Sequence, residues 1–128
     1  MSDRIDRSKW ILLVDDSPLT ADIVREALEP FGYRVTWVED GANVPEMLAQ
    51  GLPALILLDV MMPRMDGFSV LEIIRAGFET ARLPVILLTA KGEEADIVTG
   101  LELGADDYIT KPLNAKQLLD LVKSHLKE

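Results

Sequence analysis

Four short runs of mostly apolar residues in this chain each end at a polar side chain that can take part in chemistry. The runs are Ile11 to Val14, Ala54 to Leu58, Val85 to Leu88 and Tyr108 to Thr110, and they are followed by Asp15 and Asp16, Asp59, Thr89 and Lys111. Such runs alternating with helical patterns of about ten to fifteen residues are typical of βαβ units. Because parallel strands end at one edge of their sheet, we expect these polar groups to share one site.

The patterning predicts an α/β fold with about five parallel strands. Three of the runs are apolar throughout, which favours central strands covered by helices on both faces. The segment from Tyr33 to Trp37 alternates between apolar and polar residues, and the run at Tyr108 is short, so both are expected at the edges of the sheet.

Helix starts can be read from capping residues. Ser17 followed by Pro18 predicts one N-terminus, and Asp66 and Asn114 predict two others. Pro45 would remove a backbone hydrogen bond from a helix interior, so we expect that helix to begin late, with Asn43 as its cap.

Composition excludes several classes of site. The 128 residues contain no cysteine and one histidine, so a metal would have to be bound by oxygen. The net charge of −9 disfavours binding of nucleic acid or of anionic membrane by this chain alone. We expect a single domain, 1–128, with a core from about 9 to 126. The polar start, without an apolar secretory segment, predicts a cytoplasmic protein.

Three carboxylates crowded at one sheet edge repel each other and call for a cation. Asp15, Asp16 and Asp59 offer hard oxygen ligands, which suit Mg²⁺ or Mn²⁺. A carboxylate beside such an ion can attack phosphorus, while an ammonium such as that of Lys111 stabilises the phosphoryl oxygens. The hydroxyl of Thr89 can donate to the same group, so chemistry and a switch could share atoms.

The sequence resembles the receiver domains of two-component response regulators from about Lys9 to Leu126. The resemblance is carried by the segments LLVDDS from Leu12, LLDVMMPRMDG from Leu57, PVILLTA from Pro84 and GADDYITKP from Gly104. It implies a flavodoxin-like, doubly wound (βα)5 fold, a three-layer sandwich with strand order 2-1-3-4-5.

The resemblance also implies residue roles. Asp59 would be the phosphoacceptor, Asp16 a direct Mg²⁺ ligand, Asp15 a ligand acting largely through water, and the backbone carbonyl of Met61 a further ligand. Lys111 would pair with the phosphoryl group, Thr89 would be the switch hydroxyl, and Tyr108 the aromatic side chain that carries the signal to the fourth helix, fifth strand and fifth helix. The peptide bond before Pro112 would be cis.

By the same resemblance, the phosphoryl donor would be a sensor histidine kinase or phosphotransfer protein. The chain resembles single-domain, chemotaxis-regulator-like receivers, but GADDYITKP is also similar to receivers attached to winged-helix transcription factors. The sequence therefore does not decide whether the output passes through a partner protein or through a missing effector domain. It also leaves open whether phosphorylation produces a homodimer. We further expect Met61, beside the path of attacking water, to slow loss of the phosphoryl group.

Two other functions use similar parts. A Mg²⁺-dependent phosphohydrolase with an aspartate nucleophile would resemble the haloacid dehalogenase family, but that family requires a D-x-D motif and Asp16 is followed by Ser17 and Pro18. A flavin or nucleotide binder needs a Gly-, Ser- or Thr-rich phosphate loop after the first strand, where this chain carries Asp15 and Asp16. Both rank below a phosphoacceptor.

Overall fold

The computed structural model describes residues 7–62 and 65–128. Its strands are β1 (Trp10–Val14), β2 (Arg34–Val38), β3 (Leu55–Asp59), β4 (Val85–Ala90) and β5 (Asp107–Lys111). Its helices are α1 (Pro18–Leu28), α2 (Val44–Gln50), α3 (Gly67–Ala76), α4 (Glu94–Glu102) and α5 (Ala115–Leu126), with short 3₁₀ turns at η1 (Arg7–Lys9), η2 (Glu29–Phe31) and η3 (Gly41–Asn43). The start of the expected domain, 1–6, and two residues of the segment LLDVMMPRMDG, 63–64, lie outside the described residues.

All strand pairings are parallel, and the sheet order is β2-β1-β3-β4-β5. This confirms the predicted α/β fold and its strand order, with the two half-exposed segments at the edges. The strands run slightly further than the apolar runs, since β3 includes Asp59 and β5 includes Lys111. Both side chains therefore leave from regular strand backbone, whose direction the sheet fixes.

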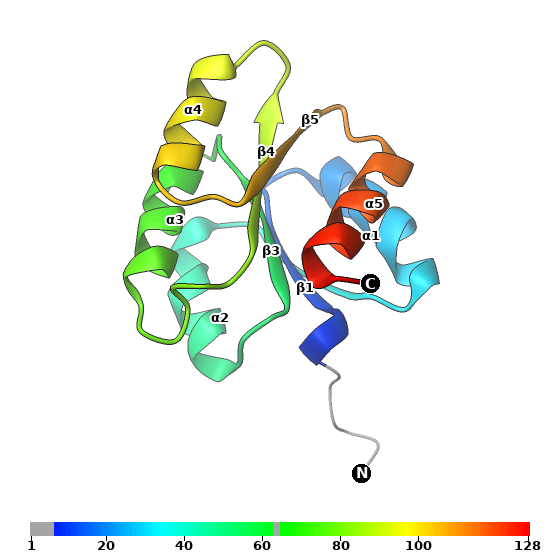
Figure 1. The fold of residues 1–128 in the computed structure, drawn as a ribbon, viewed down its shortest axis with the longest axis horizontal. Helices are drawn as coiled ribbons and strands as arrows, with labels where there is room; N and C mark the ends of the chain where they lie inside the picture. Colours follow the sequence, from blue (N-terminus) through cyan, green and yellow to red (C-terminus); the bar gives the residue numbers. More distant parts are fainter. Residues whose placement is uncertain (1–6, 63–64) are drawn as a thin grey trace.

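Helices cover both faces of the sheet (Figure 1). The helices α1 and α5 lie on one face, and α2, α3 and α4 lie on the other. Each face has its own cluster of buried apolar side chains, one including Ile11 and Leu13 and the other including Leu12 and Val14. Successive side chains of β1 therefore point alternately into the two cores. This is why the sequence of a central strand is apolar at every position.

The predicted caps at three helices are present. Ser17 Oγ accepts a hydrogen bond from Thr20 N, with Pro18 in the first turn of α1. Asp66 caps α3 and Asn114 caps α5 through the same kind of side-chain bond. The capping side chains explain why each helix begins directly after the loop at the sheet edge.

The prediction that the second helix begins late is confirmed, since α2 begins at Val44 with Asn43 at the N-cap position. The side chain of Asn43, however, makes no capping hydrogen bond. Asp40 instead caps the preceding turn η3, with Oδ1 accepting from Ala42 N at 2.9 Å. Pro45 lies in the first turn of α2, where a missing N–H removes no helical hydrogen bond.

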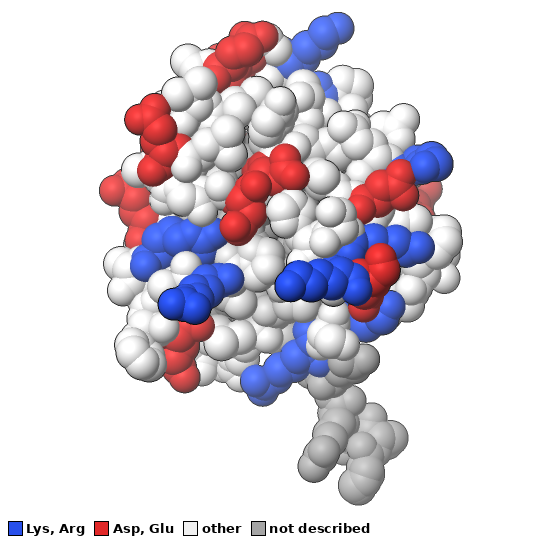
Figure 2. Space-filling view, in the orientation of Figure 1, with Lys and Arg blue, Asp and Glu red and all other residues white. Residues whose placement is uncertain are grey.

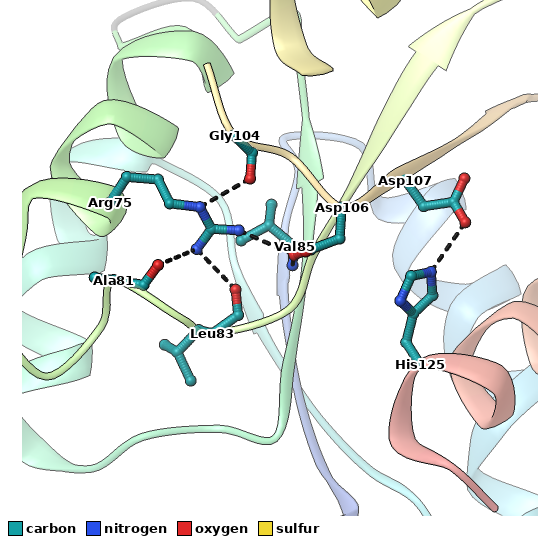
Figure 3. Close-up of polar contacts among 8 residues, drawn as sticks. All are labelled: Arg75, Ala81, Leu83, Val85, Gly104, Asp106, Asp107 and His125. Carbon is teal, nitrogen blue, oxygen red and sulfur yellow. Dashed lines mark hydrogen bonds and ion pairs between the residues drawn. The ribbon is translucent and has the colours of Figure 1, made fainter. Parts of the chain in front are cut away.

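Arg75 at the end of α3 ties three chain segments together (Figure 3). Its guanidinium donates to the carbonyl oxygens of Gly104, Ala81 and Leu83 and to Asp106 Oδ2, over distances of 2.8 to 3.1 Å. Asp106 also accepts from the backbone N–H of Val85, the first residue of β4. This network fixes the entry to β4 and the exit from α4. A separate contact joins His125 on α5 to Asp107 on β5 at 2.9 Å.

Charged side chains of both signs lie on the face shown in Figure 2, so the negative net charge does not make that face uniformly acidic. Within the described ranges, no helix is both long and apolar enough to cross a membrane.

Candidate functional site

Three carboxylates meet at the carboxyl edge of the sheet. Asp15 and Asp16 directly follow β1, and Asp59 is the last residue of β3, the strand beside it. One oxygen from each carboxylate lies within 4.8 Å of the others. Asp15 and Asp59 are buried, whereas Asp16 is exposed. The juxtaposition expected from the strand ends is therefore present.

Lys111 enters the same site from the end of β5. Its Nζ lies 2.9 Å from Asp15 Oδ2 and 3.6 Å from Asp59 Oδ1. The lysine side chain keeps 28% of its surface exposed, so its ammonium remains open to solvent on one side. One positive charge thus faces two buried carboxylates across the sheet edge.

The position of Asp15 is fixed from several directions. Its backbone N–H donates to Val38 O at 3.1 Å, and its carbonyl oxygen accepts from Trp37 Nε1 at 2.6 Å. Its Oδ1 accepts from Ser17 N at 2.8 Å, at the start of α1. Its Oδ2 is buried and has an ion pair with Lys111 but no hydrogen bond.

Asp59 is held by the turn that follows β3. Its Oδ1 accepts from the backbone N–H of Met61 at 3.3 Å, and the next residue, Val60, pairs with Leu88 O at 3.1 Å. Gly67 packs directly on this turn, because a Cβ at that position would overlap the carbonyl oxygen of Asp59 and lie 2.9 Å from Val60 Cα. The start of α3 thus supports the strand end that carries Asp59.

The environment raises the pKa of Asp59 from its usual 3.8 to about 6. Burial is the main cause, and the negative charge of Asp15 adds to it. The ammonium of Lys111 and the N–H of Met61 act in the opposite direction but do not cancel the rise. Independently of this pKa, three carboxylates share the site with one ammonium, so the formal charges do not balance.

This donor set fits a hard divalent cation. All the side-chain ligands are carboxylate oxygens, and one of them, Asp15 Oδ2, is a buried oxygen without a hydrogen bond. Mg²⁺ and Mn²⁺ prefer such oxygens and retain water or phosphate in the rest of their shell. Asp15, Asp16 and Asp59 are the residues that would hold the ion.

The structure also places the other predicted site residues, of which Tyr108 lies three residues before Lys111 on β5. Thr89 is buried, and its hydroxyl donates to Ala90 O at 3.1 Å. Met61 is 67% exposed beside Asp59, and Tyr108 is 40% exposed on β5. The peptide bond between Lys111 and Pro112 is cis.

Two residues that shape the site were not singled out from the sequence. Trp37 on β2 was expected only as an edge-strand residue, yet its indole reaches the backbone of Asp15. Gly67 ends the segment LLDVMMPRMDG, but the sequence indicated no role for it. Its contact with the Asp59 backbone depends on how α3 packs. Residue spacing signals neither contact, since the Trp37 bond joins residues 22 positions apart and the Gly67 contact depends on the path of the loop between β3 and α3.

Comparison with known proteins agrees with this geometry. The family described as "Response regulator receiver domain" matches residues 11–123. A Synechocystis protein described as a DNA-binding dual master transcriptional regulator, RpaA, is 41% identical over 117 residues, covering 91% of this chain and 48% of the relative. The chain thus spans about half the length of that relative.

Two solved structures show the same fold. The signal receiver domain of a signal transduction histidine kinase from Syntrophus aciditrophicus is 39% identical, covers 93% of this chain and 90% of its own, and has a TM-score of 0.85. The receiver domain of the sensor histidine kinase PA1611 from Pseudomonas aeruginosa is 32% identical over 94% of this chain and 98% of its own, also with a TM-score of 0.85. That structure has a magnesium ion coordinated in its active site cleft. By sequence and by fold, the chain belongs to the response regulator receiver domain family of two-component systems.

Proposed function

We propose that this chain is a Mg²⁺-dependent phosphoacceptor switch in which Asp59 receives a phosphoryl group. The donor is the phosphohistidine of a sensor histidine kinase or of a phosphotransfer protein. The supporting observation is a buried aspartate at a strand end, within reach of two further carboxylates and a lysine. The ligands of the ion are Asp15, Asp16 and Asp59, with the backbone carbonyl of Met61.

In the transfer, a carboxylate oxygen of Asp59 attacks phosphorus while the phosphorus–nitrogen bond of the donor breaks. The electron pair of that bond goes to the imidazole nitrogen. A bound Mg²⁺ would neutralise carboxylate charge and stabilise the phosphoryl oxygens. Lys111, already paired with Asp15 and Asp59, can direct its ammonium to a phosphoryl oxygen. Water later attacks the aspartyl phosphate, so the chain catalyses its own phosphorylation and dephosphorylation.

The switch begins at Thr89 in this proposal. Its hydroxyl donates to Ala90 O and would exchange that acceptor for a phosphoryl oxygen. Tyr108, on the neighbouring strand β5, would then change its rotamer. The signal would reach the surface of α4, β5 and α5, where Val98 and Leu101 are exposed apolar side chains. A partner protein or an effector domain would bind there.

The test is intact-mass measurement after incubation with acetyl phosphate and Mg²⁺. We expect one added phosphoryl group in the parent chain, and none when EDTA replaces Mg²⁺ or when Asp59→Asn replaces the parent. Addition of the group to Asp59→Asn would contradict the assignment of the acceptor. Asp16→Asn serves as a second variant. In it, Asp59 should still be phosphorylated, but more slowly than in the parent.

A generic phosphate ester separates this function from that of a phosphohydrolase with an aspartate nucleophile. Steady release of many phosphates per chain would favour the hydrolase, whereas a phosphoacceptor should release almost none. The proposal includes a single domain spanning 1–128. It also includes a cytoplasmic location, where ATP can phosphorylate the donor kinase.

A further inference from the structure

One indole N–H is directed at the backbone of the acidic site. Trp37 Nε1, on the edge strand β2, donates to the carbonyl oxygen of Asp15 at 2.6 Å. The backbone N–H of Asp15 donates to Val38 O, on the same strand. The strand β2 therefore holds both backbone polar groups of Asp15, one through its own backbone and one through a side chain.

The bond to the Asp15 carbonyl also bears on Asp16. The carbonyl of Asp15 and the N–H of Asp16 belong to one planar peptide unit, so holding the oxygen fixes that plane. Asp16 is exposed, and within the described ranges its carboxylate makes no hydrogen bond or ion pair. The direction of its side chain thus depends on the backbone that Trp37 holds.

Packing alone does not account for this contact. The Trp37 ring is partly buried against the core between the sheet and the helices α1 and α5. A phenylalanine could fill much of the same space, and a partly exposed indole N–H could be satisfied by water. What tryptophan adds at this position is a donor directed at the peptide between two acidic residues.

We propose that Trp37 is a positioning residue for the divalent cation, acting through the Asp15 carbonyl to hold Asp16 within reach of Asp59. This inference rests on the proposed function, because it assumes that the three carboxylates bind the ion. Loss of the indole N–H frees the peptide plane, and the carboxylate of Asp16 then has to be ordered when the ion binds.

The chain contains a matched control. Trp10 Nε1 donates to Thr36 Oγ1 at 2.8 Å, so each tryptophan makes one indole hydrogen bond of similar length. Trp10 is the first residue of β1 and pairs with Arg34, at the end of the sheet opposite to the acidic site. Trp37→Phe and Trp10→Phe therefore each remove one indole hydrogen bond, the first to the backbone of the acidic site and the second to the side chain of Thr36 in the middle of β2.

Cation affinity separates a positioning role from a structural one. Free Mn²⁺ can be measured by electron paramagnetic resonance, with Mg²⁺ as competitor, and stability by urea unfolding in EDTA. We expect Trp37→Phe to bind either ion about tenfold more weakly, and Trp10→Phe to bind like the parent. Equal affinity in the two variants overturns the proposal. If the parent chain binds no cation, the proposal fails together with the proposed function. If the parent is phosphorylated with Mg²⁺ but the two variants bind the cation equally well, only the proposal for Trp37 fails.

Fluorescence gives a second readout, taken in a chain that keeps Trp37. The chain has two tryptophans, so Trp37 is the sole emitter in Trp10→Phe. Its emission should change as Mg²⁺ is added and should saturate with the Mn²⁺ binding curve, whereas Trp10 in the Trp37→Phe variant should not respond. Constant Trp37 emission up to saturation overturns the proposal.

Discussion

Replacing Asp59 with asparagine should stabilise the metal-free protein at neutral pH. The ionised Asp59 is buried beside Asp15, and these two effects raise its pKa to about 6 from 3.8. An asparagine has almost the same shape and still offers an oxygen to the N–H of Met61, but it carries no charge. The variant therefore removes an unfavourable charge from the folded state.

The size and sign of the effect follow from proton linkage. The folded chain holds this proton more tightly than the unfolded chain, so the stabilisation from Asp59 is present below pH 3.8 and is lost as the pH rises through about 6. Above that pH, Asp59 costs about 3 kcal/mol relative to a neutral group, and this is the upper bound for the gain in Asp59→Asn. At pH 5 the gain should fall to about 1.6 kcal/mol, and at pH 4 to about 0.5 kcal/mol.

Urea unfolding in EDTA, repeated at pH values between 4 and 8, measures this free energy directly. Asp16→Asn is the matched control, because Asp16 is exposed and its neutralisation should change stability far less. The linkage reasoning fails if Asp59→Asn is no more stable than the parent at pH 7.5. It also fails if the gain stays constant below pH 6.

Magnesium should reduce the difference in stability between Asp59→Asn and the parent. An ion that binds only the folded chain raises stability by about 1.4 kcal/mol when its concentration is ten times its dissociation constant. The parent should gain this stabilisation, whereas Asp59→Asn, which lacks one ligand charge, should gain less at the same concentration. A larger Mg²⁺ effect in the variant would contradict the donor set.

Three further predictions concern two residues beside Asp59 and the arginine at the end of α3. Met61→Gly should shorten the lifetime of the aspartyl phosphate, measured as loss of the added mass with time, because it uncovers Asp59 to water; an unchanged lifetime would refute this. Gly67→Ala should destabilise the chain by about 1–3 kcal/mol in urea and slow phosphorylation, since its Cβ overlaps the Asp59 backbone; normal stability would contradict the contact. Arg75→Lys should cost about 2 kcal/mol in urea because one ammonium cannot replace the fork of four hydrogen bonds, while cation affinity stays unchanged.

The fold could be predicted because local and long-range signals agree. An apolar run such as Ala54 to Leu58 followed directly by Asp59 marks both a buried strand and its carboxyl end, and the structure shifts its limits by only one residue. Capping residues such as Ser17 mark helix starts equally well because their hydrogen bonds reach only three residues along the chain.

Contacts between distant segments could not be predicted in this way. Arg75 bonds to residues that follow it by 6 to 31 positions, and no periodicity indicates which of them it meets. The missing side-chain bond at Asn43 was not predicted either. Asn43 is the N-cap residue of α2, but the chain turns through η3 before that helix, and the capping hydrogen bond is made by Asp40 at the start of η3.

Charge balance explains why this arrangement can respond to phosphorylation. Three carboxylates face the single ammonium of Lys111, which leaves a formal charge of about −2 by this count. A divalent cation would bring the formal charge of the site close to zero. A phosphoryl group on Asp59 would then replace the single negative charge of the carboxylate with about two, and the nearest donors for the added charge are Lys111 and the hydroxyl of Thr89. That hydroxyl donates to the carbonyl of Ala90, the last residue of β4 before the loop to α4. An exchange of this acceptor for a phosphoryl oxygen would therefore couple the charge at Asp59 to the position of α4.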